Sequence, residues 1–318
     1  MASLVGGSVV VVGSCNIDMV TRATRFPAAG EHLIASDFGT YLGGKGANQA
    51  FAAARAGASV SMVGRVGSDA FGAQMIEALA EAGISVEAVA IDHDAPTGNA
   101  SIWLDASGEN RILIFPGANG RVSKSDIRKQ LGTIGAASVL LGQLEVPVDT
   151  IAEACRAARD AGVRVVLNAA PASPLPADLW SLIDVLVVNQ TEALALGGVT
   201  DPVRSSRVLI SKGVGTVVVT LGGAGCIVMS DVNPEPIAIQ SFPVRSVVDT
   251  TGAGDAFCGA LAASLASGAS VEEAARVGNA AGSLAVEVLG AIPSMPTYEQ
   301  IQRRLQGRCV WLSRNERQ

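Results

Sequence analysis

The sequence predicts an α/β fold in which helices cover both faces of a mostly parallel sheet. Short runs of Val, Ile and Leu alternate with longer Ala-rich stretches along most of the chain. Most of these runs are continuously apolar, as strands that are buried on both faces must be. Glycine or proline stands at many of the boundaries between the two kinds of segment. A βαβα order of this kind indicates a parallel sheet with helices on both sides.

Six apolar runs are the expected strands. They are residues 8–13, 59–64, 138–141, 163–167, 185–189 and 216–221. The expected helices lie between them and follow a polar, proline or glycine-rich start, and three of them stop at a glycine. They are residues 47–56, 69–82, 148–161 and 203–212.

Two regions break this alternation. Residues 21–41 are mixed and polar, whereas residues 99–104 and 111–115 alternate in polarity around the turn 105–108, which indicates a hairpin. Sheet-like excursions from an α/β core commonly cover a binding site, so we expect a lid. The polar residues 305–318 are expected to form a surface helix end or a tail.

Composition excludes several classes of protein. The 318 residues allow two domains or one large α/β unit, and 49% apolar against 16% charged residues excludes disorder. A net charge of −6 lacks the basic excess of nucleic-acid-binding proteins. No apolar run is long enough to cross a membrane, and no charged segment precedes an apolar one as in a signal peptide. The five scattered cysteines are expected to be reduced thiols, so we expect a cytoplasmic protein.

The glycine cluster Gly43-Gly44-Lys45-Gly46-Ala47-Asn48 precedes an expected helix. It is not a phosphate-binding P-loop, because Gly46 stands where a Mg²⁺-binding Ser or Thr is required. One interpretation is a turn that caps the helix. The presence of Lys45 and Asn48 within so tight a loop favours a ligand-binding loop instead.

A second motif, residues 248–255, leads into a helix with Phe257, Leu261 and Leu265 at helical spacing. Its two glycines free the backbone, and a helix start presents unpaired N–H groups, which together form an anion site. Asp255 is either a favourable charge at the helix N-terminus or a general base. The dinucleotide pattern GxGxxG fails at Phe257, which counts against an NAD-dependent oxidoreductase.

Polar residues also follow several expected strands. Asn189 and Glu192 form either a helix cap or a site for Mg²⁺ and phosphate oxygens, and residues 220–225 form either a hairpin turn or a wall against a nucleotide. Asn16 and Asp18 are expected at the end of the first strand, and Glu145 after the strand 139–144. Open α/β sheets bind ligands at the carboxyl ends of their strands. Polar residues after several strands therefore indicate a binding site more strongly than any one of them does alone.

With these residues in view, the chain resembles the ribokinase group of the PfkB family of carbohydrate kinases. The resemblance runs from about residue 9 to residue 296 and includes GGKGANQA at 43–50, DTTGAGD at 249–255 and the segment Asn16-Ile17-Asp18. It implies a ribokinase-like three-layer α/β/α sandwich with a mostly parallel central sheet and a small β-sheet lid. The implied core comprises residues 1–15, 42–97 and 117–318, and the implied lid comprises residues 16–41 and 98–116.

The resemblance implies ATP-dependent phosphorylation of the 5-hydroxyl of D-ribose, with Mg²⁺ and a monovalent cation, K⁺. Asp255 would be the catalytic base, and the amides of Gly252, Ala253 and Gly254 would form the anion hole. The implied sugar contacts are Asn16, Asp18, Gly44, Lys45, Asn48, Glu145 and Asp255. The implied nucleotide contacts are Asn189, Glu192, Thr220, Leu221, Gly222, Gly223, Ala224, Gly225, Gly254 and Asn279. The implied K⁺ positions are Asp249, Thr251, Ala285, Val288, Gly290 and Ser294. The lid would pair with that of a second subunit in a homodimer.

Two alternatives stay open. The chain could phosphorylate another acceptor of the same family, such as fructose, 2-keto-3-deoxygluconate or adenosine, although Lys45 and Asn48 favour ribose. It could also be a catalytically silent sugar-binding regulator, against which the intact Asp255 and its two glycines argue. The departures from the family pattern are Asn168-Ala169-Ala170-Pro171, which should alter only a loop, and Asn279, which should alter adenine contacts.

Overall fold

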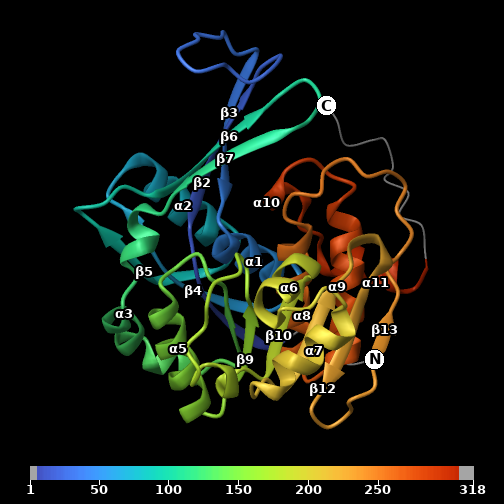
Figure 1. The fold of residues 1–318 in the computed structure, drawn as a ribbon. Coiled ribbons are helices and arrows are strands. Elements are labelled where there is room, and N and C mark those ends of the chain that lie inside the picture. The colour runs from blue at the N-terminus through green and yellow to red at the C-terminus, as the bar shows by residue number, and fades with distance from the viewer. Residues whose placement is uncertain (1–5, 308–318) are drawn as a thin grey trace.

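The computed structural model describes residues 6–307, which form one large and one small sheet with helices packed around the large one (Figure 1). The large sheet has nine strands in the order β13-β12-β11-β10-β9-β8-β1-β4-β5. All neighbouring strands run parallel except at one edge, where β12 runs antiparallel to both β11 and β13. Its strands are β1 (Ser8–Val12), β4 (Ser59–Gly67), β5 (Ser85–Asp92), β8 (Val139–Gly142), β9 (Arg164–Asn168), β10 (Val185–Asn189), β11 (Thr216–Thr220), β12 (Cys226–Ser230) and β13 (Ile237–Ile239).

The helices cover both faces of the large sheet. They are α1 (Lys45–Arg55), α2 (Ala70–Glu81), α3 (Lys124–Lys129), α4 (Leu131–Gly135), α5 (Val148–Asp160), α6 (Gln190–Gly197), α7 (Pro202–Ser211), α8 (Ala253–Ala266), α9 (Val271–Ala285), α10 (Ala291–Ser294) and α11 (Tyr298–Leu305). Short 3₁₀ helices are η1 (Gly117–Arg121), η2 (Trp180–Leu182) and η3 (Gly222–Ala224).

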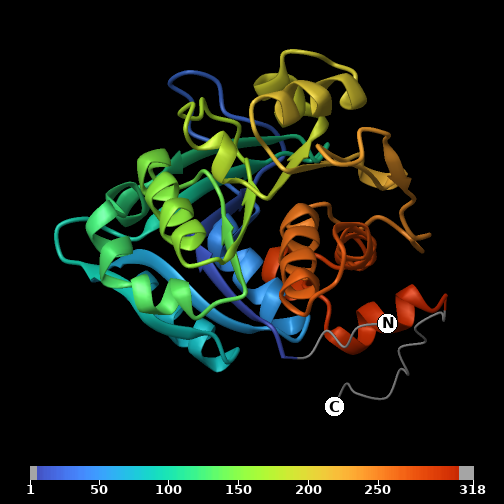
Figure 2. The ribbon, with the colours of Figure 1, turned by 90° about the horizontal axis from the view of Figure 1, so that it is seen from below.

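Alternation along the interior strand β1 divides the hydrophobic core into two layers. Val9 and Val11 belong to the cluster that α1, α2, α8 and α9 cover, whereas Val10 and Val12 belong to the cluster under α3, α5 and α7. All four side chains are buried, because an interior parallel strand with helices on both faces has no solvent-facing side. Figure 2 shows α8 and α9 on one side of the sheet and α5 on the other. The predicted α/β/α sandwich is therefore confirmed.

The small sheet rises above one end of the core in Figure 1. It contains β2 (Asn16–Arg22), β3 (Asp37–Gly43), β6 (Gly98–Leu104) and β7 (Asn110–Phe115), in the order β3-β2-β6-β7. The predicted hairpin is the antiparallel pair β6–β7. β3 is a mostly exposed strand, in keeping with its mixed, polar sequence.

The six expected strands and four expected helices all have counterparts, with ends that differ by a few residues. Asp69, expected as the first residue of a helix, is instead the N-cap of α2 and accepts a hydrogen bond from the Gly72 amide. One placement was wrong: Asn16 and Asp18 do not end the first strand. The chain leaves β1 at Val12 and enters β2 of the small sheet, where Asn16 pairs with Gly43 and Gly98.

In the described part of the chain, no helix combines the length and the apolar character that a membrane span requires. The four cysteines at positions 15, 155, 226 and 258 are buried free thiols. Of the expected polar tail, Leu305 ends α11, and residues 308–318 lie outside the described residues.

Candidate active site

The glycine cluster lets the start of α1 pack against the end of β1. Gly44 is the N-cap of α1 and has a positive φ of 90°, a conformation that L side chains rarely adopt. A Cβ on Gly46 would lie 2.4 Å from the backbone nitrogen of Ser14, so only glycine fits there. The interpretation as a turn at a helix start is thus correct, and the same turn carries Lys45 and Asn48 toward the carboxyl edge of the sheet.

Asp255 lies in the first turn of α8, and its carboxylate meets α1. Gly252 begins this helix with a left-handed φ of 76°. Asp255 is buried, and its Oδ2 accepts a hydrogen bond from Asn48 Nδ2 at 3.0 Å. Its Oδ1 accepts a second from Gln49 Nε2 at 2.9 Å. The two motifs, more than 200 positions apart in the sequence, therefore form one site.

Charges in this site are strongly coupled. Burial raises the pKa of Asp255 above its usual value, although Lys45 and the hydrogen bonds from Gln49 and Asn48 oppose the rise. Burial also opposes the charge of Lys45, yet the negative fields of Asp255, Glu145 and Glu192 raise its pKa overall. Lys45 therefore stays a cation beside the buried Asp255 carboxylate, and its charge favours the ionised form of that carboxylate.

The polar residues around Asp255 come from both sheets. Glu145 Oε2 accepts hydrogen bonds from Ser14 Oγ at 2.6 Å and from the Lys45 amide at 3.0 Å. Burial, together with Glu145 and Asp255, raises the pKa of Asp18 to about 6. Asn16 lies directly beside the loop, because a Cβ on Gly44 would be 2.8 Å from its backbone nitrogen.

All six predicted sugar-contacting positions besides Asp255 thus gather near that residue. They are Asn16, Asp18, Gly44, Lys45, Asn48 and Glu145. The arrangement presents carboxylate, amide and ammonium groups within one site, the set of donors and acceptors that a polyol requires.

A cavity of about 440 Å³ begins at the same helix start. It runs from Ala253 and Gly254 of α8 to Asn279 of α9 and to the segment Phe242–Val244. A Cβ on Gly254 would meet nothing within 4 Å, so the first turn of α8 faces open space there. A volume of this size is ample for a nucleotide-sized ligand.

The predicted nucleotide contacts divide into those that line this cavity and those that do not. The lining residues are Thr220, Gly222, Gly223, Gly225, Gly254 and Asn279. Leu221 and Ala224 do not line the cavity. They belong to the turn between the antiparallel strands β11 and β12, which is the hairpin turn that one interpretation of residues 220–225 predicted. Asn279 Nδ2 donates to the carbonyl of Ile239 at 3.0 Å, which ties α9 to the end of β13.

Asn189 and Glu192 form a complete capping box at the start of α6. Asn189 Oδ1 accepts from the Glu192 amide at 2.8 Å, and Glu192 Oε2 accepts from the Asn189 amide at 2.9 Å. Burial raises the pKa of Glu192, while Lys45 opposes and Asp255 adds to that rise. The pair therefore caps a helix and also lies within the electrostatic reach of the site.

The segments predicted to hold K⁺ lie together. Asp249 accepts hydrogen bonds from the amides of Thr251 and Gly290, each at 2.9 Å. Although partial burial opposes its charge, these bonds lower the pKa of Asp249. The Val248 amide donates to the carbonyl of Val286 at 2.8 Å, which holds this loop against residues 285–290, and Ser294 ends α10 just beyond. Within residues 6–307, no three His, Cys, Asp or Glu side chains cluster as a metal site.

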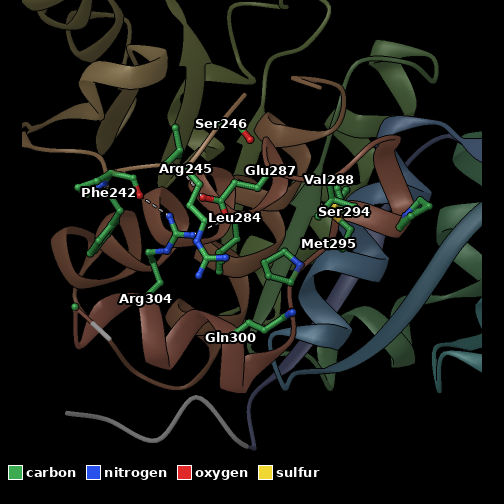
Figure 3. A pocket seen from close by; sticks show the side chains of 15 residues that line it. Phe242, Arg245, Ser246, Leu284, Glu287, Val288, Ser294, Met295, Gln300 and Arg304 are labelled. Atoms are coloured by element: carbon green, nitrogen blue, oxygen red, sulfur yellow. Dashed lines mark hydrogen bonds and ion pairs between the residues drawn. The ribbon is translucent and has the colours of Figure 1, made fainter. Parts of the chain in front are cut away.

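A second cavity, of about 470 Å³, lies beside the first and shares the wall Phe242–Val244 (Figure 3). Arg304 of α11 donates to the carbonyl of Pro243 at 2.8 Å and to Glu287 Oε2 at 2.9 Å. Val288 and Ser294 also line this cavity. Arg304 therefore anchors a segment that forms one side of the cavity of about 440 Å³.

Sequence reasoning missed the buried amides that support the site. They are Gln49, Asn119, Gln143 and Asn168, together with the hydroxyl of Ser14. Gln49 lies inside a motif that the sequence did single out, and its neighbour Asn48 could have drawn notice to it. Asn119 and Gln143 lie in no recognisable motif, so only the three-dimensional arrangement identifies them.

Comparison with known proteins agrees with this geometry. The family model described as pfkB family carbohydrate kinase matches residues 7–298. A mouse ribokinase is 39% identical over 297 residues, covering 91% of this chain and 92% of the mouse protein. A ribokinase of Haemophilus influenzae is 38% identical over 298 residues, covering 92% of this chain and 96% of that protein.

Solved structures give the same result. A ribokinase from Thermotoga maritima superposes with a TM-score of 0.87 at 33% identity, covering 95% of this chain and 100% of that one. The structure of Arabidopsis thaliana ribokinase complexed with ribose and ATP also has a TM-score of 0.87, at 36% identity, covering 95% of this chain and 99% of the other. Since both sequence and fold match across nearly the whole length, the chain belongs to the PfkB family of carbohydrate kinases.

Proposed function

We propose that this protein transfers the γ-phosphoryl group of ATP to O5 of D-ribose, giving ribose 5-phosphate and ADP. The observation that carries the proposal is the position of the start of α8. Asp255 there faces the polar cluster of Lys45, Asn48 and Glu145, while Ala253 and Gly254 of the same turn line the adjoining cavity. One helix start thus borders both a polyol site and a nucleotide-sized space, as transfer between the two substrates requires.

Asp255 is the proton acceptor in this scheme. As O5 of ribose attacks the γ-phosphorus, its proton passes to the Asp255 carboxylate, and the bond between the γ-phosphorus and the bridging oxygen of ADP breaks. Lys45 lies beside the carboxylate and favours its ionised form before the proton arrives. The Asn48 and Gln49 amides hold both carboxylate oxygens.

Backbone amides at the start of α8 stabilise the charge that develops on the transferred group. The first N–H groups of any α-helix lack intrahelical partners, and the helix dipole favours an anion at this end. The Gly254 position faces open space, so a phosphoryl oxygen can approach this turn closely. The related ribokinase with ribose and ATP bound supports the same pair of substrates.

Two ions complete the proposed site. Mg²⁺ would neutralise the phosphate oxygens near Asn189 and Glu192, whose oxygen atoms suit a hard cation. K⁺ would lie between the Asp249–Thr251 turn and residues 285–294, where a carboxylate held by the Gly290 amide and several loop carbonyls supply oxygen ligands. A nearby fixed cation would support the charge balance of the anion hole.

The small sheet, with residues 16–41 and 98–116, is the proposed lid. Its strand β2, which pairs in parallel with β6, carries Asn16 and Asp18 to the sugar site. The edge strand β7 exposes Ile112, Leu113 and Ile114, with Leu113 74% exposed. Exposed apolar edges are usually covered, so we assign this surface to the lid of a second copy in a homodimer. The buried free thiols fit a reducing, cytoplasmic location.

An ATP-consumption assay across pentoses, hexoses and nucleosides, with K⁺ present or replaced by tetramethylammonium, tests the proposal. We expect the highest kcat/KM with D-ribose and a loss of activity without K⁺. A clear preference for fructose, 2-keto-3-deoxygluconate or adenosine would assign another acceptor. Intact ATP after long incubation with every acceptor would indicate a sugar-binding regulator instead.

A further inference from the structure

Gln49 is a fully buried amide in the second turn of α1, and nothing in its position exposes it to a sugar. Its Nε2 donates to Asp255 Oδ1 and to Asn168 Oδ1, each at 2.9 Å. Its Oε1 accepts a hydrogen bond from Gln143 Nε2 at 2.7 Å. Every polar atom of this side chain is therefore engaged within the protein.

These partners fix which end of the Gln49 amide faces Asp255. Gln143 Nε2 donates to the Gln49 oxygen, but Gln143 Oε1 has no partner, so the direction of the Gln49 amide is set by its two acceptors, Asp255 and Asn168. Asn168 is itself oriented, because its Nδ2 donates to the carbonyl of Val187 at 3.1 Å and its oxygen is then left for Gln49. A reversed Gln49 would place its oxygen against Asp255 Oδ1 and Asn168 Oδ1, so the amide cannot turn without losing these two hydrogen bonds.

Close packing of α1 on α8 keeps Gln49 Nε2 within hydrogen-bond distance of Asp255 Oδ1. Gly259 lies one helical turn after Asp255, and a Cβ there would be 2.6 Å from the carbonyl oxygen of Gln49 and 2.4 Å from Ala52 Cβ. The absence of a side chain at Gly259 lets the backbone of α1 touch α8. Because the two helices lie so close together, the Gln49 side chain reaches the Asp255 carboxylate directly.

We propose that Gln49 is a positioning residue, which keeps the Asp255 carboxylate oriented and ionised for the proton transfer. This inference rests on the proposed function, in which Asp255 is the proton acceptor. Asn48 also donates to Asp255, but it lies among the sugar-facing residues, whereas Gln49 reaches the carboxylate from the protein interior.

The charged and titratable groups around Asp255 do not replace this hydrogen bond. Lys45 of α1 attracts the carboxylate's charge, whereas Glu145 after β8, Asp18 of β2 and Glu192 of α6 oppose it. The Cys258 thiol on α8 is also near, and burial raises its pKa well above the usual value, so it stays neutral. With three acidic neighbours against one cation, a directed N–H at Oδ1 has a measurable part in keeping the carboxylate ionised.

The test uses Gln49→Met, which keeps the size of the side chain and removes its hydrogen bonds, and Gln143→Met as the matched control. Gln143→Met removes one bond of the same network but leaves the Gln49 donor on Asp255. A hydrogen bond to a charged group is strong enough that its loss should raise the pKa of Asp255 by about 1–2 pH units. Should Gln49→Met fail to fold, the double variant Gln49→Met/Gln143→Met avoids leaving the Gln143 amide unpaired.

Two readouts are needed. The first is the ¹³C NMR titration of aspartate carboxyls in the ligand-free protein, with the Asp255 signal assigned by its loss in Asp255→Asn. The second is the pH profile of kcat/KM for ribose. In Gln49→Met, we expect the midpoint of the NMR titration and the midpoint of the pH profile both to rise, and kcat to fall more at pH 6 than at pH 8. In Gln143→Met, both midpoints should stay within about 0.3 pH units of the wild-type values.

The outcomes separate the two proposals. An unchanged Asp255 titration in Gln49→Met, or an equal shift in Gln143→Met, would overturn the role of Gln49. If the wild-type protein phosphorylates no acceptor but the NMR midpoint still rises in Gln49→Met, the proposed function fails while the positioning of Asp255 by Gln49 stands.

Discussion

Asn119 fixes the orientation of the Asn16 amide. Asn119 Nδ2 donates to Asn16 Oδ1 at 2.7 Å. Asn119 cannot turn, because its Oδ1 accepts from the Cys15 amide at 2.8 Å and its Nδ2 also donates to the Cys15 carbonyl at 3.0 Å. Asn16 therefore turns its NH₂ group away from Asn119. This assigns a donor to Asn16 in the proposed sugar site, where Asp18 and Glu145 are acceptors.

The substitution Asn119→Asp tests this relationship. One carboxylate oxygen can still accept from the Cys15 amide, but the other would face both Asn16 Oδ1 and the Cys15 carbonyl oxygen. The carbonyl cannot move away, which should lower stability somewhat, whereas the Asn16 amide should reverse. The proposed ribose site would then lose a donor, and the KM for ribose should rise about 3–10-fold, the range for one neutral hydrogen bond. The KM for ATP should stay unchanged. Equal changes in both KM values would contradict a specific effect on Asn16.

Gly254 offers a clean test of the anion hole. A Cβ at this position meets nothing within 4 Å, so Gly254→Ala should leave the melting temperature unchanged or slightly raised. The added methyl would occupy the space of a phosphoryl oxygen, and kcat should fall about 10²-fold or more. Gly259→Ala is the contrasting variant, because its Cβ would be 2.4 Å from Ala52 Cβ and should lower the melting temperature. Normal turnover in Gly254→Ala would remove the proposed anion hole.

The role of Asp255 as proton acceptor predicts a loss of rate without a loss of ribose binding. Asp255→Asn keeps the shape of the side chain but cannot take up the proton, so kcat should fall about 10²–10⁴-fold. Calorimetry should give a ribose dissociation constant within a few-fold of the wild type. Turnover close to normal would exclude the role, and complete loss of ribose binding would point to a mainly structural carboxylate.

The fold was largely predictable because its signals are local. Continuous apolar runs such as Val185–Asn189 have few alternatives to a buried parallel strand, and glycines end the helices between them. The small sheet was harder. Asn16 and Asp18 follow β1 so closely that the sequence predicts them at the end of that strand. Only the pairing of β2 with β3 and β6 assigns them to the small sheet.

The site was predictable only where it lies in motifs. Glycines at Gly44 and Gly252 mark positive-φ turns, and Asp255 follows one of them directly. The supporting contacts are long-range: Gln143 and Gln49 are 94 positions apart, and Asn119 and Asn16 are 103 apart. Amides of this kind have no periodicity or spacing of their own, so a single sequence cannot reveal their partners.

The exposed edge of the small sheet predicts that the protein dimerises. Leu113 is 74% exposed at the centre of β7, flanked by Ile112 and Ile114. Leu113→Asp should therefore shift the protein from dimer to monomer in sedimentation velocity, because a charge would be buried unpaired at the interface. Gln74→Asp, an exposed position on α2, is the control and should leave the dimer intact. A wild-type protein that sediments as a monomer would remove the assignment.

Asp18 predicts a trade-off between stability and function that depends on pH. Burial, Glu145 and Asp255 raise its pKa from 3.8 to about 6 in the folded protein. Between these values the folded state binds a proton that the unfolded state has lost, so stability falls as pH rises through this range. The ionised side chain therefore destabilises the fold by about 3 kcal/mol at pH 8, and this cost is absent below the unfolded pKa.

Asp18→Asn should accordingly be more stable than the wild type at pH 8 by up to about 3 kcal/mol, and the difference should disappear below about pH 4. The free energy of unfolding from urea titrations at several pH values measures this. Asp231→Asn removes a charge at an exposed position and serves as the control. The same Asp18 variant should bind ribose more weakly, because an anionic acceptor for a sugar hydroxyl is lost. A stability difference that does not change with pH would show that Asp18 is not held in an environment that resists its charge.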